Sequence, residues 1–297
     1  MPRTPITIVT GYLGSGKTTL LRRILDETNR RLAIIMNEFG EIGIDGRILQ
    51  GKNVNMVELS GGCVCCSLTG EFEAAVREII GTINPEAIVV ETTGVAEPDA
   101  LIVNVQDSIP EVRLDSAITI VDADGMVKFP SLGHTGRVQI EMADLILINK
   151  TDLVSQENLA QVQNKVREVN GRAAIFEAVR CNIDTELLFG IEAEKKVITR
   201  HRQHIEEEEI EAFGYSSTVV LDRERFETLL RNMPNGVYRA KGFVNFPEGG
   251  YLFNYVSGRW DFEEFQATGN HLVFIGKRIT KHQESLIEQL RRCEIKM

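Results

Sequence analysis

The sequence predicts an α/β protein with a mainly parallel sheet flanked by helices, followed by a small α+β domain. Short apolar runs alternate with amphipathic stretches until about residue 190, and such strand–helix alternation favours a parallel sheet. A highly charged stretch then interrupts the alternation, and the pattern of strands and helices changes after it. We therefore expect a first domain at 1–190, a charged linker at 191–212 and a second domain at 213–297.

In the first domain, seven apolar runs have the length and composition of buried strands, and they cover residues 6–10, 31–37, 54–59, 86–91, 117–123, 144–150 and 173–179. Apolar residues at helical spacing predict amphipathic helices around 72–80 and 159–169. No helical pattern separates the second and third runs, so the pairing of these two strands stays open.

In the second domain we expect a strand, a helix capped by Asp222, three further strand segments and a last helix. Ser257 and Gly258 predict a turn within the long segment at 250–262. Thr280 and Gln283 have the spacing of a capping box at the start of the last helix.

The composition excludes some function classes. The chain has 297 residues and a formal net charge of −10, which argues against general binding to nucleic acid, because phosphate contacts need a clustered basic surface. No stretch approaches the roughly 20 apolar residues of a membrane span, and the first residues do not have the pattern of a signal peptide. We therefore expect a cytoplasmic protein without a membrane partner, in which clustered cysteines are metal ligands or reactive groups.

The segment GYLGSGKT at 11–18 fits the phosphate-binding pattern G-x-x-x-x-G-K-[ST], between a predicted strand and a predicted helix. Its glycines let backbone N–H groups face phosphates at a helix N-terminus, Lys17 can reach the β- and γ-phosphates, and Thr18 can hold Mg²⁺. A P-loop NTPase sheet is therefore the predicted fold. The residues expected to bind nucleotide here are Gly11, Gly14, Ser15, Gly16, Lys17, Thr18 and Thr19.

The segment NKTD at 149–152 follows the sixth apolar run and matches the guanine-recognition pattern N-K-x-D. The Asp152 carboxylate can accept hydrogen bonds from guanine N1–H and the 2-amino group, neither of which adenine offers. Asn149 and Lys150 would brace the loop and the base. Cys181 follows the last apolar run, where it either flanks the base or only packs in the interior.

Two further polar segments follow strands. Glu91, in ETTG, is expected to act on Mg²⁺ and Gly94 to sense the γ-phosphate, although a simple polar turn is the alternative. The segment NEFGEIGID at 37–45 is either a switch loop with Asp45 near the magnesium or an ordinary surface loop. Lys17 is a catalytic candidate, and either Glu38 or Glu91 could position the attacking water.

Three of the five cysteines lie together in GGCVCC, at Cys63, Cys65 and Cys66. Because parallel strands end at one edge of the sheet, we expect these thiols near the nucleotide. Three thiols leave room for an outside ligand on a zinc or softer ion, and Glu38, Glu41, water or a partner could supply it. The alternative is a redox-active or simply buried cluster.

These motifs, in this order and followed by YRAKG (238–242) and VFIG (273–276), resemble the CobW family of P-loop GTPases over essentially the whole chain. The resemblance implies a GTP-hydrolysing metallochaperone with a cysteine-bound metal coupled to nucleotide state through the region around Glu38 and Glu41. It implies zinc as the commonest cargo, with cobalt in some members. The chain departs from many members because it has only His201 and His204 where a long His-rich tract would stand.

The resulting hypothesis is a GTPase with slow intrinsic turnover that binds GTP/GDP, Mg²⁺ and Zn²⁺ and delivers zinc to a client metalloprotein. The alternatives are a chaperone loaded with Co²⁺ that acts in cobalamin synthesis or nitrile hydratase activation, an ATP-dependent kinase or ATPase with structural cysteines, and a thiol redox protein. A homodimer is left open.

Overall fold

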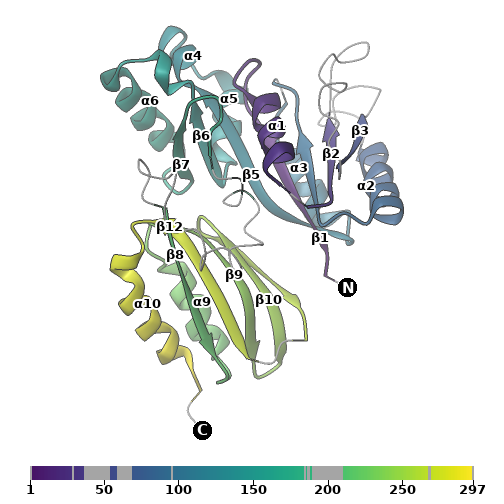
Figure 1. The fold of residues 1–297 in the computed structure, drawn as a ribbon, viewed down its shortest axis with the longest axis vertical. Coiled ribbons are helices and arrows are strands. Elements are labelled where there is room, and N and C mark those ends of the chain that lie inside the picture. Colours follow the sequence, from purple (N-terminus) through teal and green to yellow (C-terminus); the bar gives the residue numbers. More distant parts are fainter. Residues whose placement is uncertain are drawn as a thin grey trace. The chain divides into compact units, whose positions relative to one another are not determined.

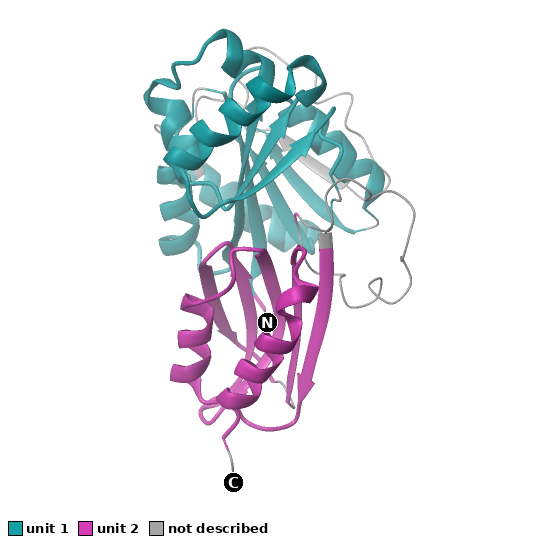
Figure 2. Cartoon of the chain, turned by 90° about the vertical axis from the view of Figure 1, so that its left-hand side faces the viewer, with its two compact units in different colours: residues 1, 3–185 teal, residues 2, 186–297 magenta. Residues whose placement is uncertain are grey.

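A computed structural model describes the protein over residues 2–28, 30–36, 54–58, 69–94, 96–183, 185, 188, 210–266 and 269–295. The chain divides into two compact units, one reaching to Thr185 and the other running from Glu186 to the C-terminus (Figure 2). Each unit is described by itself.

The first unit contains a sheet of seven described strands in the order β3-β2-β4-β1-β5-β6-β7, all paired in parallel (Figure 1). The strands are β1 (Thr4–Thr10), β2 (Leu32–Met36), β3 (Val54–Glu58), β4 (Ala87–Glu91), β5 (Val112–Asp122), β6 (Leu145–Asn149) and β7 (Ala174–Ala178). The predicted parallel P-loop sheet is therefore confirmed, and the second and third strands, whose pairing was open, are neighbours.

The helices of this unit are α1 (Lys17–Glu27), α2 (Thr69–Ile83), α3 (Asp99–Asp107), α4 (Ala123–Lys128), α5 (Gly133–Glu141) and α6 (Gln156–Val169), with a 3₁₀ turn η1 (Thr151–Leu153). The apolar faces predicted for α2 and α6 are buried, at Phe72 and Val76 and at Leu159 and Val162. Strands β4 and β6 are buried along their whole length, as expected for a sheet covered by helices.

Strand β5 begins five residues earlier than its apolar run predicted. Arg113 and Asp115 interrupt the hydrophobic pattern, yet both side chains are buried and their charges pair at 3.1 Å. A buried charged pair at alternate positions of a strand cannot be distinguished from a polar loop by hydrophobic pattern alone.

The second unit contains an antiparallel sheet in the order β11-β10-β9-β12-β8, and two helices pack on one face of it. Its elements are β8 (Ile210–Ser217), α9 (Arg223–Arg231), β9 (Val237–Phe246), β10 (Gly249–Val256), β11 (Arg259–Glu264), β12 (Asn270–Lys277) and α10 (Thr280–Cys293). Phe226, Phe246 and Phe253 are buried at the centre of its core. The small α+β fold predicted for this part is thus observed.

Two local predictions in this unit were wrong. Strand β8 already begins at Ile210, inside the segment expected to be linker, because Ala212 packs against Val273 and Ile275. Helix α10 has no capping box: Ile279 is its N-cap, and both the amide and the hydroxyl of Thr280 donate to Glu211 Oε2 at 2.7 Å. A carboxylate from a neighbouring strand takes the place of the local cap.

Candidate nucleotide-binding site

The candidate site lies where the parallel strands of the first unit end. Strand β1 lies between β4 and β5, with β2, β3 and β4 on one side of it and β5, β6 and β7 on the other, so the chain changes sides after β4. Open α/β sheets bind ligands outside the carboxyl ends of their strands at such a change of direction. The loops after β1, β4, β5, β6 and β7 therefore meet at one edge.

The loop after β1 makes close contact with its neighbours at two glycines. A Cβ on Gly11 would lie 2.4 Å from the carbonyl oxygen of Ile120 in β5. Gly16 has φ +118°, and a Cβ there would lie 2.5 Å from Asn149 Nδ2 and 2.9 Å from Cys181 Sγ. Only glycine, which has no Cβ, allows the backbone to lie this close to its neighbours. This explains why the motif has glycine at positions 11 and 16.

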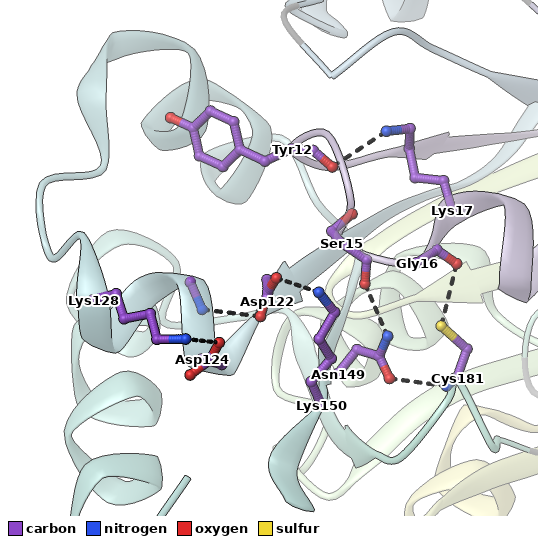
Figure 3. A network of polar contacts seen from close by, with 11 residues as sticks. Tyr12, Ser15, Gly16, Lys17, Asp122, Asp124, Lys128, Asn149, Lys150 and Cys181 are labelled. Atoms are coloured by element: carbon purple, nitrogen blue, oxygen red, sulfur yellow. Dashed lines mark hydrogen bonds and ion pairs between the residues drawn. The ribbon is translucent and has the colours of Figure 1, made fainter. Parts of the chain in front are cut away.

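Lys17 is the first residue of α1, and only 7% of it is exposed. Its ammonium donates to the carbonyl oxygen of Gly11 at 2.9 Å and to that of Tyr12 at 3.3 Å, and Figure 3 shows the contact with Tyr12. Burial lowers the pKa of Lys17, and the charge of Glu91 acts in the opposite direction. An anion beside this ammonium would remove the electrostatic cost of burying it.

The start of α1 fits a phosphate group. No side chain caps this helix, and its first turn contains no acidic residue, so its N–H groups and its dipole are available to an external anion. The buried hydroxyl of Ser15 has no hydrogen-bond partner among the described residues. Thr18 is half-buried and Thr19 is exposed in the same turn. We conclude that the residues present fit a nucleotide phosphate.

Asn149 connects the two predicted halves of the site. It ends β6 and is buried, and its Nδ2 donates to the carbonyl oxygen of Ser15 at 2.8 Å (Figure 3). Its Oδ1 accepts from the backbone N–H of Cys181 at 2.9 Å. One side chain thus joins the loops after β1, β6 and β7, which places the predicted base-binding motif beside the phosphate-binding motif.

The other residues of the NKTD segment follow Asn149 closely. Lys150 has φ +62°, and its ammonium pairs with Asp122 Oδ2 at 2.6 Å. The hydroxyl of Thr151 donates to the carbonyl oxygen of Ala178 at 3.2 Å. Asp152 is exposed in η1, where a ligand from solvent can reach its carboxylate.

Asp122 is a site residue that the sequence analysis missed. It ends β5 and caps α4, with Oδ1 accepting from the N–H of Gly125 at 3.0 Å while Oδ2 holds Lys150. An aspartate at the end of an apolar run, followed three residues later by glycine, was the available signal. The carboxylate fixes the lysine of the predicted base-binding loop.

We expect Asp122→Asn to weaken GTP and GDP binding together, by about tenfold, because Lys150 loses its charged partner. Loss of the ion pair with Lys150 and of the negative charge at the start of α4 should also lower the free energy of unfolding, by about 1 kcal/mol. Asp124→Asn is the matched control, since Asp124 pairs with Lys128 on the surface of the same helix, and it should change stability by less than about 0.5 kcal/mol. Calorimetric titration and urea unfolding measure both effects, and equal behaviour of the two variants would contradict this role.

Cys181 lies beneath the phosphate-binding loop. Its thiol is completely buried and contacts the carbonyl oxygen of Gly16 at 3.3 Å, and its backbone N–H donates to Asn149 Oδ1. Burial raises the pKa of Cys181 to about 12. The thiol packs against the loop rather than facing solvent, and a contact between this segment and a base stays a prediction.

The loop after β4 lies against the loop after β1. Glu91 is buried at the end of β4, and Thr92 donates its N–H to the carbonyl oxygen of Val9 at 3.0 Å. A Cβ on Gly94 would lie 2.5 Å from the backbone nitrogen of Leu13. The predicted γ-phosphate loop and the P-loop are thus in backbone contact, while the roles of Glu91 and Gly94 toward Mg²⁺ and phosphate stay predictions.

Several predicted residues lie outside the described part of the chain: Glu38, Glu41, Asp45, Cys63, Cys65, Cys66, His201 and His204. The described strands still define where the segment with the three cysteines starts. Strand β3 ends at Glu58, in register with Met36 of β2, which in turn is in register with Glu91 of β4. The chain therefore leaves β3 at the same sheet edge as the other loops. No group of three or more metal-binding side chains occurs among the residues that the structure describes.

The two described cysteines allow a specific prediction about thiol reactivity. Burial raises the pKa of Cys181 to about 12 and that of Cys293 to about 11. At pH 8 only about one Cys181 thiol in ten thousand would be ionised, and alkylation requires the thiolate. We expect iodoacetamide to leave Cys181 and Cys293 unlabelled in the native protein and to label both after unfolding, as measured by peptide mass spectrometry. Rapid labelling of Cys181 in the folded protein would contradict this.

The fold and this constellation define the class of protein: a P-loop nucleotide-binding protein with an additional antiparallel domain. Residues 5–177 match the family model described as CobW/HypB/UreG, nucleotide-binding domain, and residues 210–294 match the cobalamin synthesis protein cobW C-terminal domain. The chain belongs to the CobW/HypB/UreG family, and the resemblance predicted from its motifs is confirmed.

Curated relatives carry related names. The chain is 32% identical to the zinc chaperone CobW of Pseudomonas aeruginosa over 66% of this chain and 62% of that protein, less than two thirds of its length. It is 28% identical to the zinc chaperone CobW of a Sinorhizobium species over 92% of both chains. It is 37% identical to the zinc-regulated GTPase metalloprotein activator 1 of Schizosaccharomyces pombe, over 61% of this chain and 47% of that protein.

Among the described helices, none combines the length and the apolar character needed to span a bilayer.

Proposed function

We propose that this protein is a GTP-hydrolysing metallochaperone that carries zinc and delivers it to a client metalloprotein. The observation that carries the proposal is the 2.8 Å hydrogen bond from Asn149 to Ser15, because it joins the predicted base-binding loop to the phosphate-binding loop. The names of the relatives support GTP as the nucleotide and zinc as the cargo.

On the nucleotide side, each residue has a role that follows from its place. Lys17 gives up its two carbonyl partners to bind the β- and γ-phosphates, and the N-terminus of α1 adds backbone donors. Asp152 selects guanine. Magnesium, when bound, neutralises phosphate charge, and Thr18 and Glu91 are the described residues proposed to hold it.

On the metal side, we propose that Cys63, Cys65 and Cys66 bind the zinc cargo, with Glu38 or Glu41 as a further ligand. The support is the strand register: β3, which precedes the cysteine segment, ends at the same sheet edge as β2 and β4. The phosphate loop follows β1 at this edge. Binding of GTP would change the contacts made by the loops after β2 and β4, change the ligands available to zinc, and so couple the two sites. Hydrolysis would reverse that change and release the cargo to the client.

Competition binding tests the nucleotide assignment. Labelled GDP should be displaced by GTP and GDP but not by ATP, and purified protein should release phosphate from GTP at a low rate. Displacement by ATP as effective as by GTP would contradict the proposal and favour an ATPase.

A further inference from the structure

Gln139, on helix α5, binds the loop after β4 through its side chain. It is 1% exposed, and its amide nitrogen donates to the carbonyl oxygens of Ala96 at 2.9 Å and Gly94 at 3.3 Å. The backbone carbonyl of Gln139 accepts from the hydroxyl of Thr119 in β5 at 2.6 Å. A buried side-chain amide that uses both of its hydrogens on one loop fixes the path of that loop.

The first turn of the same helix binds the phosphate loop. The hydroxyl of Tyr12 donates to the carbonyl oxygen of Leu132 and accepts from the N–H of Gly136 at 3.1 Å. A Cβ on Gly136 would lie 2.4 Å from the Tyr12 oxygen, so the ring lies directly on this glycine. The hydroxyl of Thr135 contacts Glu97, in the loop after β4, at 3.4 Å. Helix α5 therefore touches both loops that would surround a γ-phosphate.

The hydrogen bonds to Gln139 determine how the peptide groups of the β4 loop are oriented. The carbonyl of Thr93 accepts from the N–H of Ala96 at 3.0 Å, inside the loop. Because a trans peptide directs its carbonyl and its N–H to opposite sides, the Gly94 N–H points away from Ala96. The carbonyl of Gly94 is held by Gln139, so both peptide groups flanking Gly94 are fixed.

We propose that helix α5 holds the described part of the loop after β4, residues 92–94 and 96–97, in register with the phosphate loop, with Gln139 as the positioning residue and Tyr12 as the anchor on the phosphate loop. This arrangement sets the discrimination between GTP and GDP and the rate of hydrolysis. The inference rests on the proposed GTPase function. Gln139 acts through the loop and contacts no nucleotide itself.

The test compares Gln139→Glu with Gln156→Glu in the full-length protein. Gln139→Glu keeps the size of the side chain but replaces the double donor with an acceptor that faces two carbonyl oxygens. Gln156→Glu makes the same change at an exposed position on α6. We expect Gln139→Glu to lower kcat for GTP by about a hundredfold, with GDP affinity within twofold of wild type, because misplacing a positioned group by about 1 Å has effects of that size. The control variant should keep wild-type values.

A second variant keeps the proposal falsifiable if Gln139→Glu folds poorly. Tyr12→Phe removes only the hydroxyl, so the ring stays on Gly136, and it should lower kcat in the same direction without weakening GDP binding. If both variants lose GTP and GDP affinity in parallel with a lower melting temperature, or change nothing, the inference is wrong. If wild-type protein itself does not hydrolyse GTP, the proposed function fails instead, which the wild-type measurement shows separately.

Discussion

Lys17→Ala is expected to lower kcat/KM for GTP by a hundredfold to about a thousandfold, the range seen when one donor to a developing negative charge is removed. The ammonium is buried next to an uncapped helix start, and among the described residues its hydrogen-bond partners are two backbone carbonyls of its own loop. Phosphate release from GTP measures the effect.

The same variant should remain folded, which separates loss of chemistry from loss of structure. Burial lowers the pKa of Lys17, so the charged form costs folding free energy. That cost is fully present below the folded-state pKa and disappears as pH rises through the interval up to the unfolded value. At neutral pH the variant no longer bears this cost, but it also loses the two hydrogen bonds that Lys17 donates. Because these two effects oppose each other, its melting temperature should lie within about 3 °C of wild type. Lys281→Ala, on the surface of α10, is the control and should keep wild-type turnover. Wild-type turnover in Lys17→Ala would refute the assignment of Lys17 to the phosphates.

Asp152→Asn should change which base the protein prefers. The carboxylate can accept from both guanine N1–H and the 2-amino group, whereas an amide presents one acceptor and one donor. The amide donor faces the 2-amino group of guanine unfavourably but suits the 2-oxo group of xanthine. We expect affinity for GTP to fall at least about a hundredfold and xanthosine triphosphate to become the better ligand, since sites built on hydrogen bonds discriminate strongly against a missing partner.

Competition titrations with GTP, xanthosine triphosphate and ATP measure this change of preference. Asp107→Asn, at an exposed position near the end of α3, makes the same substitution away from the site and should leave all three affinities unchanged. Unchanged GTP affinity in Asp152→Asn would show that NKTD is an ordinary turn.

The sequence predicted the strands well where burial is complete and poorly where it is mixed. In β6, residues 145–148 are all apolar because helices cover both sides of the sheet, and the short length of this run favours a strand over a helix. The start of β5 was missed because Arg113 and Asp115 satisfy each other's charge in the interior. The cap of α10 was misassigned because its partner, Glu211, lies 69 residues away in the chain.

The residues of the candidate site also fall into two groups, those that the sequence predicted and those that only the structure reveals. Its motif residues follow strand ends, and parallel pairing then brings those ends together, so Lys17 and Asn149 could be placed from sequence alone. Gln139 has no such signal: it lies within an ordinary helix, and only the folded chain brings its amide to the β4 loop. The local motif predicts which groups bind, while long-range contacts determine which groups position them.

The central claim is that zinc binding and nucleotide binding are coupled across one edge of one sheet. Zinc affinity, measured by chelator competition on the protein loaded with a non-hydrolysable GTP analogue, with GDP and with no nucleotide, tests it most directly. The account predicts values that differ at least about fivefold between states, with the analogue's own affinity shifted by the same factor when zinc is present. Identical zinc affinity in all three states would contradict it.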